Sequence, residues 1–296
     1  MKAIKVPAYA KINLILRILG KRRDGFHTLN TILQTIDLRD ELTFEFEPAT
    51  KFNINLKLSD PKIPDDESNL IYRACQAFHK THPLKHRVKI NVEKRIPIQS
   101  GLGGGSSDAA STLIALSRLN DWTVPIKELH RIAATLGSDV PFFLEGGTAL
   151  GTVRGDKIRK LDDWPALNLL LVIPDVSCST SAIYEEYDRR NLLTPESKSI
   201  KIRDVQRPES QRDYVSLVEN DLERVVFALY PELDSIKKRL LKLGAIAAAL
   251  TGSGSAIFGL FPDSVEFEKA AKAFSNSIRT RFVKRDEYRK ALGFSI

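Results

Sequence analysis

Residues 97–110 have the sequence PIQSGLGGGSSDAA, a glycine cluster followed by two serines, an aspartate and an alanine pair. Just upstream, apolar and polar residues alternate over residues 88–93, and a period of two predicts a β-strand. Downstream, apolar residues recur at helical spacing from Ala109 to Leu116, with serine and aspartate at the start of the first turn. The stretch therefore predicts strand, glycine loop and helix in that order.

This order of elements is suited to binding an anion. Glycine lets the backbone turn tightly and bring its N–H groups against a ligand, and a helix N-terminus adds unpaired N–H groups and partial positive charge. Phosphate is a common ligand of such a site. No lysine follows Gly105, so the loop is not a Walker motif, and Ser106 stands where a strict G-x-G-x-x-G motif has its third glycine. The alternative is a glycine-rich turn without a ligand.

The length and composition fit a globular protein of two domains. The chain has 296 residues, and its 43% hydrophobic content is enough for a sizeable core. Two cysteines, Cys75 and Cys178, provide no disulfide framework, which fits a reducing compartment. Arg17 interrupts the apolar N-terminal run, so we expect neither a signal peptide nor a membrane span, and a cytoplasmic location.

A formal net charge of +8 is compatible with two kinds of partner. It could attract nucleic acid, or it could collect an anionic small substrate. The basic residues are spread along the chain instead of forming one block, which favours a small molecule over nucleic acid. His79, His82 and His86 lie close together, but without a cysteine or nearby carboxylate they predict a polar turn and no metal site.

The N-terminal region predicts a strand that ends in a chemically distinctive turn. Alternation over Ala8–Ile18 places Lys11 and Asn13 on one face, two residues apart. The pattern alone favours the simpler explanation, a half-exposed strand with solvated polar residues. The turn Asp24-Gly25 is followed by Phe26 and His27, an aromatic and an imidazole at a predicted loop tip.

The rest of the sequence predicts a mixture of helices and strands, with a domain boundary near Asp162-Asp163. Asp139 precedes a proline and an apolar run, so by itself it could be only a helix N-cap. The order of elements after the boundary predicts a ferredoxin-like domain. The expected elements are helices at 69–80, 124–136 and 265–274, a hairpin at 145–155, strands at 42–46, 167–173, 245–250, 256–261 and 279–283, a polar excursion at 189–212, and two helices within 217–243 split at Pro231.

Three segments together resemble the motifs of the GHMP small-molecule kinases. They are AYAKINLILRILGKRRDGFHTL, then IPIQSGLGGGSSDAA with LGSDVPFFLEGGTALGTVRGD, and finally ALTGSGSAIFGLF. The similarity covers nearly the whole chain in the right order. It implies an α+β fold of two domains: residues 1–162 as an N-terminal α/β domain with the glycine-rich phosphate loop, and residues 163–296 as a ferredoxin-like C-terminal domain. The active site would lie between them.

The resemblance also implies an activity. Such a kinase uses ATP, with Mg²⁺, to phosphorylate a hydroxyl group of a small molecule. The GFH turn at 25–27 and the segment DVSCSTSAIY at 175–184 are most similar to the branch that acts on a cytidine-diphosphate-linked sugar alcohol in isoprenoid synthesis. The alternatives are a homoserine- or mevalonate-type kinase and, less favoured, a non-catalytic nucleic-acid-binding protein. A monomer or weak homodimer is expected.

Site residues follow from the same motifs. The resemblance implies that Asp139 is the catalytic base and Lys11 its basic partner, and Ser107 is a candidate ligand of the divalent ion. One departure concerns Gln99 and Ser100, which replace small residues of the family loop; a positive φ at position 99 would strain glutamine. The implied ATP contacts are Pro97, Ile98, Gln99, Ser100, Gly101, Leu102, Gly103, Gly104, Gly105, Ser106 and Ser107, and the implied substrate contacts are Asn13, Phe26, His27, Lys94, Thr180 and Tyr184.

Overall fold

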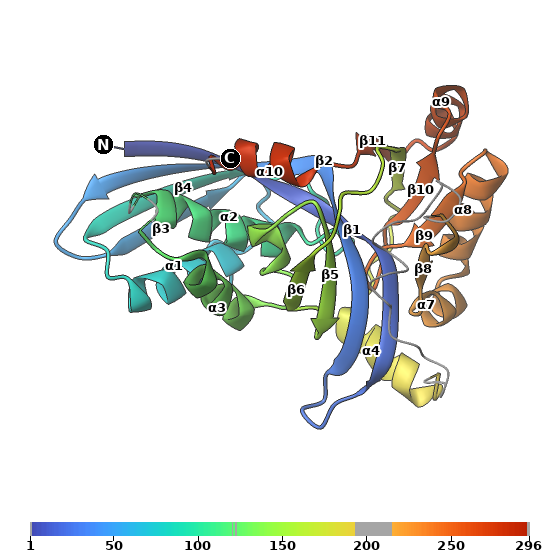
Figure 1. The fold of residues 1–296 in the computed structure, drawn as a ribbon, viewed down its shortest axis with the longest axis horizontal. Coiled ribbons are helices and arrows are strands. Elements are labelled where there is room, and N and C mark those ends of the chain that lie inside the picture. Colours follow the sequence, from blue (N-terminus) through green and yellow to red (C-terminus); the bar gives the residue numbers. More distant parts are fainter. Residues whose placement is uncertain (1, 120, 122, 193–214, 295–296) are drawn as a thin grey trace.

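The structure is a computed structural model that describes residues 2–119, 121, 123–192 and 215–294. Two long antiparallel strands, β1 (Lys2–Lys21) and β2 (His27–Pro48), are its longest elements, and the predicted turn at Asp24-Gly25 joins them (Figure 1). Both strands extend well beyond the segments whose alternation predicted them. His27 is not at a loop tip, as the sequence predicted, but is the first residue of β2 and is buried.

β1 and β2 belong to a seven-stranded sheet whose main path runs β3-β4-β2-β1-β8. Beside that path, β5 pairs with the first part of β2, and β6 pairs with β5. The predicted hairpin at 145–155 is therefore shifted, because the turn lies at residues 154–156 between β5 and β6. The strands not yet bounded are β3 (Asn53–Leu58), β4 (His86–Glu93), β5 (Thr148–Val153), β6 (Lys157–Lys160) and β8 (Glu219–Asn220).

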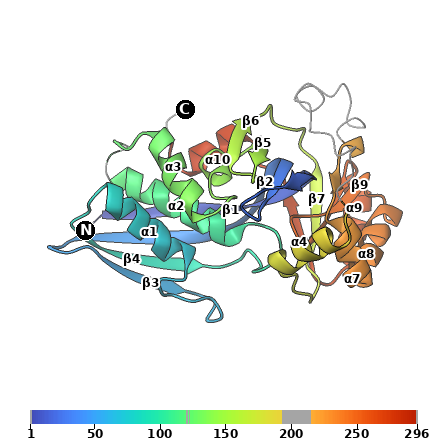
Figure 2. The same ribbon diagram turned by 90° about the horizontal axis from the view of Figure 1, so that it is seen from below.

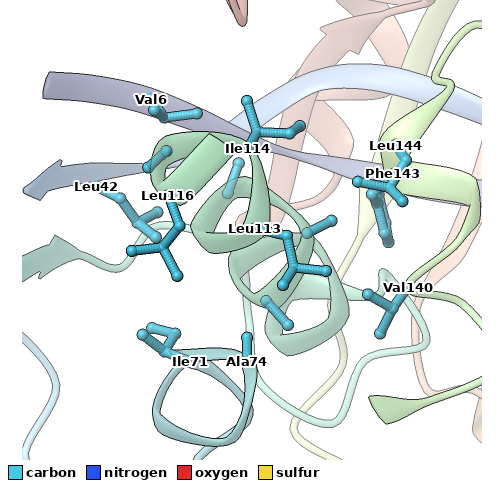
Figure 3. Close-up of a cluster of buried hydrophobic side chains, with 14 of the residues drawn as sticks. Val6, Leu42, Ile71, Ala74, Leu113, Ile114, Leu116, Val140, Phe143 and Leu144 are labelled. Carbon is cyan, nitrogen blue, oxygen red and sulfur yellow. The ribbon is translucent and has the colours of Figure 1, made fainter. Parts of the chain in front are cut away.

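Three helices cover one face of this sheet, as Figure 2 shows from below. They are α1 (Leu70–Thr81), α2 (Gly104–Leu119) and α3 (Ile126–Leu136), and a short 3-10 helix, η1 (Phe142–Leu144), follows α3. α2 is buried almost all round between the sheet and the other two helices, which explains its many small residues. Figure 3 shows Leu113, Ile114 and Leu116 of α2 pointing into the core formed with α1, β1 and β2.

The C-terminal part contains a second, four-stranded antiparallel sheet in the order β11-β7-β10-β9. Along the chain, helices lie between β7 and β9 and between β10 and β11. Together with the strand order, this is the ferredoxin-like arrangement that the sequence predicted. Its elements are β7 (Asn168–Val172), α4 (Thr180–Arg189), α7 (Glu223–Leu229), α8 (Pro231–Lys242), β9 (Ala247–Leu250), β10 (Ile257–Phe261), α9 (Ser264–Ala273) and β11 (Ser277–Arg281).

Two C-terminal elements pack onto the first sheet, and the sequence analysis predicted neither. β8 pairs in parallel with β1, and α10 (Arg285–Ala291) returns to the N-terminal core. Tyr288 of α10 is buried beside Tyr9 and donates a hydrogen bond to the Phe143 carbonyl. Most of the polar excursion predicted at 189–212 lies outside the described residues. Among the described helices, none has the length and apolar character needed to cross a bilayer.

Candidate active site

The glycine loop is held against both sheets before α2 begins. The backbone N–H of Lys11 donates to the Leu102 carbonyl at 3.0 Å, and that of Ala256 donates to the Ser100 carbonyl at 3.2 Å. Gly101 has φ +77°, and a Cβ at this position would lie 2.1 Å from the Thr251 carbonyl oxygen. The loop can take this path only because it lacks side chains at its closest approaches.

Gln99 adopts the strained conformation that the sequence analysis considered. Its φ is +52°, in the left-handed region, and its side-chain oxygen accepts a 2.6 Å hydrogen bond from the Ser177 hydroxyl. That bond joins the beginning of the loop to the segment before α4. The side chain at position 99 therefore provides a cross-cleft contact that the smaller residues usual in the family cannot make.

A basic and an acidic side chain meet at the mouth of this loop. Lys11 Nζ lies 3.4 Å from Asp139 Oδ2, and it donates to Asn13 Oδ1 at 2.7 Å. The lysine side chain is only 4% exposed, whereas that of Asp139 is 36% exposed. Asn13 in turn donates to the Thr31 hydroxyl at 2.8 Å. Asn13 therefore holds the Lys11 ammonium in place, and the Asp139 carboxylate is partly open to solvent.

The turn between β9 and β10 closes the same region from the C-terminal part. The Thr251 hydroxyl accepts from the Asn13 backbone N–H at 3.1 Å. Asn220 of β8 donates to the carbonyls of Leu250 and Gly252 at 2.9 and 2.8 Å. Ser253 shares a 2.8 Å hydrogen bond with Thr180 at the start of α4. Three distant segments therefore fix the position of this turn.

An aromatic group lines another part of the same cleft. Phe26 is 53% exposed, and the Arg154 guanidinium lies 5.2 Å from its ring centroid. The Tyr184 ring stacks on His27 with the centroids 4.9 Å apart. Burial raises the pKa of Tyr184, so its hydroxyl keeps its proton at neutral pH. The exposed ring of Phe26 offers a flat surface on which a base could stack.

Lys94 lies behind the glycine loop between two acidic side chains. Its ammonium is 2.5 Å from Asp40 Oδ2 and 2.6 Å from Asp108 Oδ2. Burial would lower the pKa of Lys94, but the two carboxylates outweigh it and raise the pKa. Within the described residues, the buried Ser107 hydroxyl and Asp108 Oδ1 have no hydrogen-bond partner.

One cleft of about 940 Å³ brings these groups together, and it is lined from both parts of the chain. Every residue that the resemblance implied for the site lines this cleft except Ser107, whose hydroxyl is buried below the loop. The sequence analysis missed other lining residues: Lys21, Arg154, Asp188, Gly252 and Ser253. Gly252 and Ser253 lie inside the TGSGS motif that it quoted, so that motif was the available signal for them.

Comparison with known proteins agrees with this architecture. The description "GHMP kinases N terminal domain" matches residues 69–147, and "GHMP kinases C terminal" matches residues 206–279. A 4-diphosphocytidyl-2-C-methyl-D-erythritol kinase of Solibacter usitatus is 42% identical over 286 residues, which cover 95% of this chain and 89% of the relative. The chain belongs to the 4-diphosphocytidyl-2-C-methyl-D-erythritol kinase family. It is therefore a small-molecule kinase of the GHMP superfamily.

Solved structures support the same family. A 4-(cytidine 5'-diphospho)-2C-methyl-D-erythritol kinase has a TM-score of 0.77 and 31% identity, with 94% of this chain and 99% of that one covered. A homoserine kinase from Cytophaga hutchinsonii has a TM-score of 0.69 at 21% identity, with 97% of each chain covered. The second likeness shows the shared fold alone. The comparisons thus favour the cytidyl branch over the homoserine-type alternative.

Proposed function

We propose that the cleft transfers the γ-phosphoryl group of ATP to the 2-hydroxyl of 4-diphosphocytidyl-2-C-methyl-D-erythritol, a step in isoprenoid precursor synthesis. Family membership supports both the phosphoryl donor and the acceptor. The observation that carries the proposal is the Lys11–Asp139 pair, 3.4 Å apart, at the mouth of a glycine loop that opens a helix. A loop of this kind is a phosphate site, and the pair lies where the terminal phosphate would meet an alcohol.

The proposed phosphate site consists of the loop amides and the N-terminus of α2. The residues assigned to it run from Pro97 to Ser107, and we assign the closest contacts with the phosphates to Gly101–Ser107. Mg²⁺ belongs to this proposal, since a bound magnesium ion would offset negative charge on the phosphates. The Ser107 hydroxyl fits as a ligand, because it is a buried oxygen without a partner in the described part of the chain. No cluster of three or more His, Cys, Asp or Glu side chains suited to a metal occurs among the described residues.

Catalysis is assigned to Asp139 and Lys11. Asp139 would orient the substrate hydroxyl and accept its proton, and Lys11 would neutralise charge on the carboxylate and on the transferred phosphoryl group. A carboxylate paired with an ammonium is a weak base. That is sufficient if the transition state is loose, because little proton transfer is then needed before the new P–O bond forms.

The cytidine end of the substrate is assigned to the part of the cleft that Phe26 and His27 line. Phe26 offers an exposed ring, and stacking of a base on an aromatic ring is worth about 1–3 kcal/mol. His27 can form a hydrogen bond with the base edge, while Asn13, Lys94, Thr180 and Tyr184 complete the proposed substrate side. Tyr184 stacks on His27, so in this proposal it also holds the plane of the imidazole.

Several further expectations remain proposals. We expect a small-molecule partner and neither a nucleic-acid nor a membrane partner, a monomer or weak homodimer, and a cytoplasmic location. The boundary at residues 162 and 163 is a proposal of the same kind. A steep salt dependence of RNA binding without ATP turnover would favour the nucleic-acid alternative instead.

A coupled ADP-release assay with three acceptors tests the function. We expect turnover with the cytidyl methylerythritol substrate and little or none with homoserine or mevalonate. In the Asp139→Asn variant, kcat should fall by at least about 10²-fold, within the range of general-base contributions. Circular dichroism and thermal unfolding would show that this variant is folded.

Asp162→Asn is the matched control, since it makes the same chemical change at an exposed residue that does not line the cleft. Its kcat should equal that of the unmodified chain. Preferential turnover of homoserine or mevalonate would overturn the substrate assignment. An undiminished kcat in folded Asp139→Asn would remove Asp139 from the mechanism while leaving the kinase activity itself intact.

A further inference from the structure

One face of α4 surrounds the His27 ring. Tyr184, Tyr187 and Asp188 are three and four positions apart, so they project from the same side of the helix (Figure 1 shows α4 beside the ends of β1 and β2). Tyr184 stacks on the imidazole at 4.9 Å, and Tyr187 meets it edge-on at 6.4 Å. Asp188 Oδ1 lies 2.7 Å from His27 Nε2. The ring is therefore fixed in its plane and at one of its nitrogens.

The contact of Lys21 with the second carboxylate oxygen of Asp188 helps to determine whether His27 Nε2 is the donor or the acceptor. Lys21 Nζ donates to Asp188 Oδ2 at 2.6 Å. Partial burial would raise the pKa of Asp188, but the hydrogen bonds from Lys21 and His27 outweigh it, so the pKa lies below its ordinary value. An ionised carboxylate can only accept hydrogen bonds. In the neutral imidazole, Nε2 must therefore carry the proton and Nδ1 must be the acceptor.

That acceptor belongs to a ring that lines the cleft. His27 lines the cleft and is otherwise buried. Within the described residues, Nδ1 forms no hydrogen bond with the protein, and it is not one of the buried polar atoms that lack a partner. Nδ1 is thus an acceptor without a protein partner, on a ring that lines the same cleft as the exposed Phe26.

We propose that Asp188, by fixing this tautomer of His27, makes the site accept cytosine and reject uracil. Cytosine carries an amino donor at C4, which can donate to Nδ1. Uracil carries a carbonyl oxygen there, so two acceptors would face each other. In this proposal Asp188 acts on the base through His27, which makes it a positioning residue. The inference rests on the proposed function, because it presupposes that a pyrimidine base is bound at Phe26 and His27.

Binding of CDP and UDP tests the inference without relying on turnover. Calorimetry is done with the nucleotide loop saturated by a non-hydrolysable ATP analogue, so that both probes report on the base end. The unmodified chain should bind CDP at least about tenfold more tightly than UDP, the effect of one mismatched buried hydrogen bond. In Asp188→Asn, Lys21 can donate only to the amide oxygen, which leaves the amide N–H to donate to Nε2. The proton then moves to Nδ1, and the CDP preference should disappear or invert.

A second readout uses the unmodified protein and is independent of any variant's folding. The ¹⁵N shifts of the histidine rings distinguish protonated from unprotonated nitrogens, and the His27→Gln spectrum assigns the signal. In the neutral ring, Nδ1 of His27 should be the unprotonated nitrogen. Protonation of Nδ1 in the neutral ring would overturn the inference.

Glu186→Gln is the matched control on the same helix. Its carboxylate pairs with Arg189 and Arg190, and the residue does not line the cleft, so the ratio of CDP to UDP affinity should be unchanged. If the unmodified chain prefers CDP and Asp188→Asn keeps the same ratio, the role of Asp188 is refuted and the proposed function stands. If the unmodified chain binds neither probe, or binds both equally, the cytidyl assignment fails and the inference fails with it.

Discussion

At the residue scale, the most unusual electrostatic arrangement outside the Lys11–Asp139 pair is the single ammonium of Lys94 between two buried carboxylates. Asp40 also accepts hydrogen bonds from the backbone N–H groups of Arg95 and Ile96, so it is well stabilised as an anion. Asp108 has no such donors besides Lys94, and its Oδ1 has no partner within the described residues. Burial raises the pKa of Asp108 to about 7, and the nearby charge of Asp40 adds to this against the opposing effect of Lys94.

The raised pKa predicts a dependence of stability on pH. The ordinary pKa of aspartate in an unfolded chain is about 3.9, so the folded state binds more protons between about pH 4 and pH 7. The contribution of Asp108 to stability is therefore fully present below about pH 4 and is lost as the pH rises through 7. Asp108→Asn removes this loss, and it should unfold at a higher temperature than the unmodified chain at pH 8, but not at pH 4.

The measurement is thermal unfolding of both proteins at several pH values. The Asp108→Asn variant should gain about 1–2 kcal/mol over the unmodified chain at pH 8 relative to pH 4, less than the ideal linkage figure because buried pairs relax. Asp121→Asn serves as the comparison, since Asp121 is exposed and its side-chain partner is an exposed lysine. A pH-independent difference between Asp108→Asn and the unmodified chain would contradict the raised pKa.

The residues that line the cleft could be predicted where they belong to local sequence motifs. Lys11, Asp139 and Gly101–Ser106 lie in contiguous, recognisable segments, and all three line the cleft. Lys21 and Asp188 could not be predicted, because each is an ordinary surface residue type and their contact joins positions 167 residues apart. A long-range ion pair leaves no periodic pattern in a single sequence.

At the element scale, the loop before α2 depends on the absence of side chains. Gly101→Ala would add a Cβ 2.1 Å from a backbone oxygen of the β9–β10 turn, at a φ of +77°. The clashing oxygen belongs to the backbone and not to a flexible side chain, so the loop must move. We expect a loss of about 2 kcal/mol or more in the free energy of unfolding, measured by chemical denaturation, and an increased KM for ATP.

Gly20→Ala separates this effect from a general cost of replacing glycine. Gly20 lies in β1 with no atom within 4 Å of an added Cβ and without a positive φ, so both measurements should stay near those of the unmodified chain. If Gly101→Ala were as stable as Gly20→Ala, the tight packing of the loop on the β9–β10 turn would be refuted.

The elements themselves were predicted unevenly, for identifiable reasons. The helices α1 and α3 were predicted to within two residues at each end, because each has a clear apolar stripe. β3 and β8 were missed, since β3 is a partly exposed edge strand and β8 has only two residues. α10 was missed because its seven residues bury only Tyr288 and are otherwise charged, so helical periodicity is almost absent.

At the scale of the whole molecule, the hydrophobic core does not divide at residues 162 and 163. One cluster joins Ile12 and Ile32 of the long strands to Leu169, Leu171 and Phe258 of the second sheet. Another includes Tyr288 and Leu292, which pack with the helices of the N-terminal part. The ferredoxin-like order of the second sheet was predictable from the sequence. The shared packing was not, because it depends on contacts that only the folded chain brings together.

The shared core predicts that the chain unfolds as one cooperative unit. Differential scanning calorimetry should give one transition whose calorimetric and van't Hoff enthalpies agree. Leu171→Ala, in the second sheet, should shift the whole transition downward, because removing a fully buried leucine side chain costs about 2–5 kcal/mol. Residues 1–162 alone should not fold cooperatively, since that fragment lacks β8 and α10 and would expose the surface that Tyr288 covers. Two separate transitions, with only one of them shifted by Leu171→Ala, would show instead that the parts on either side of residue 162 fold independently.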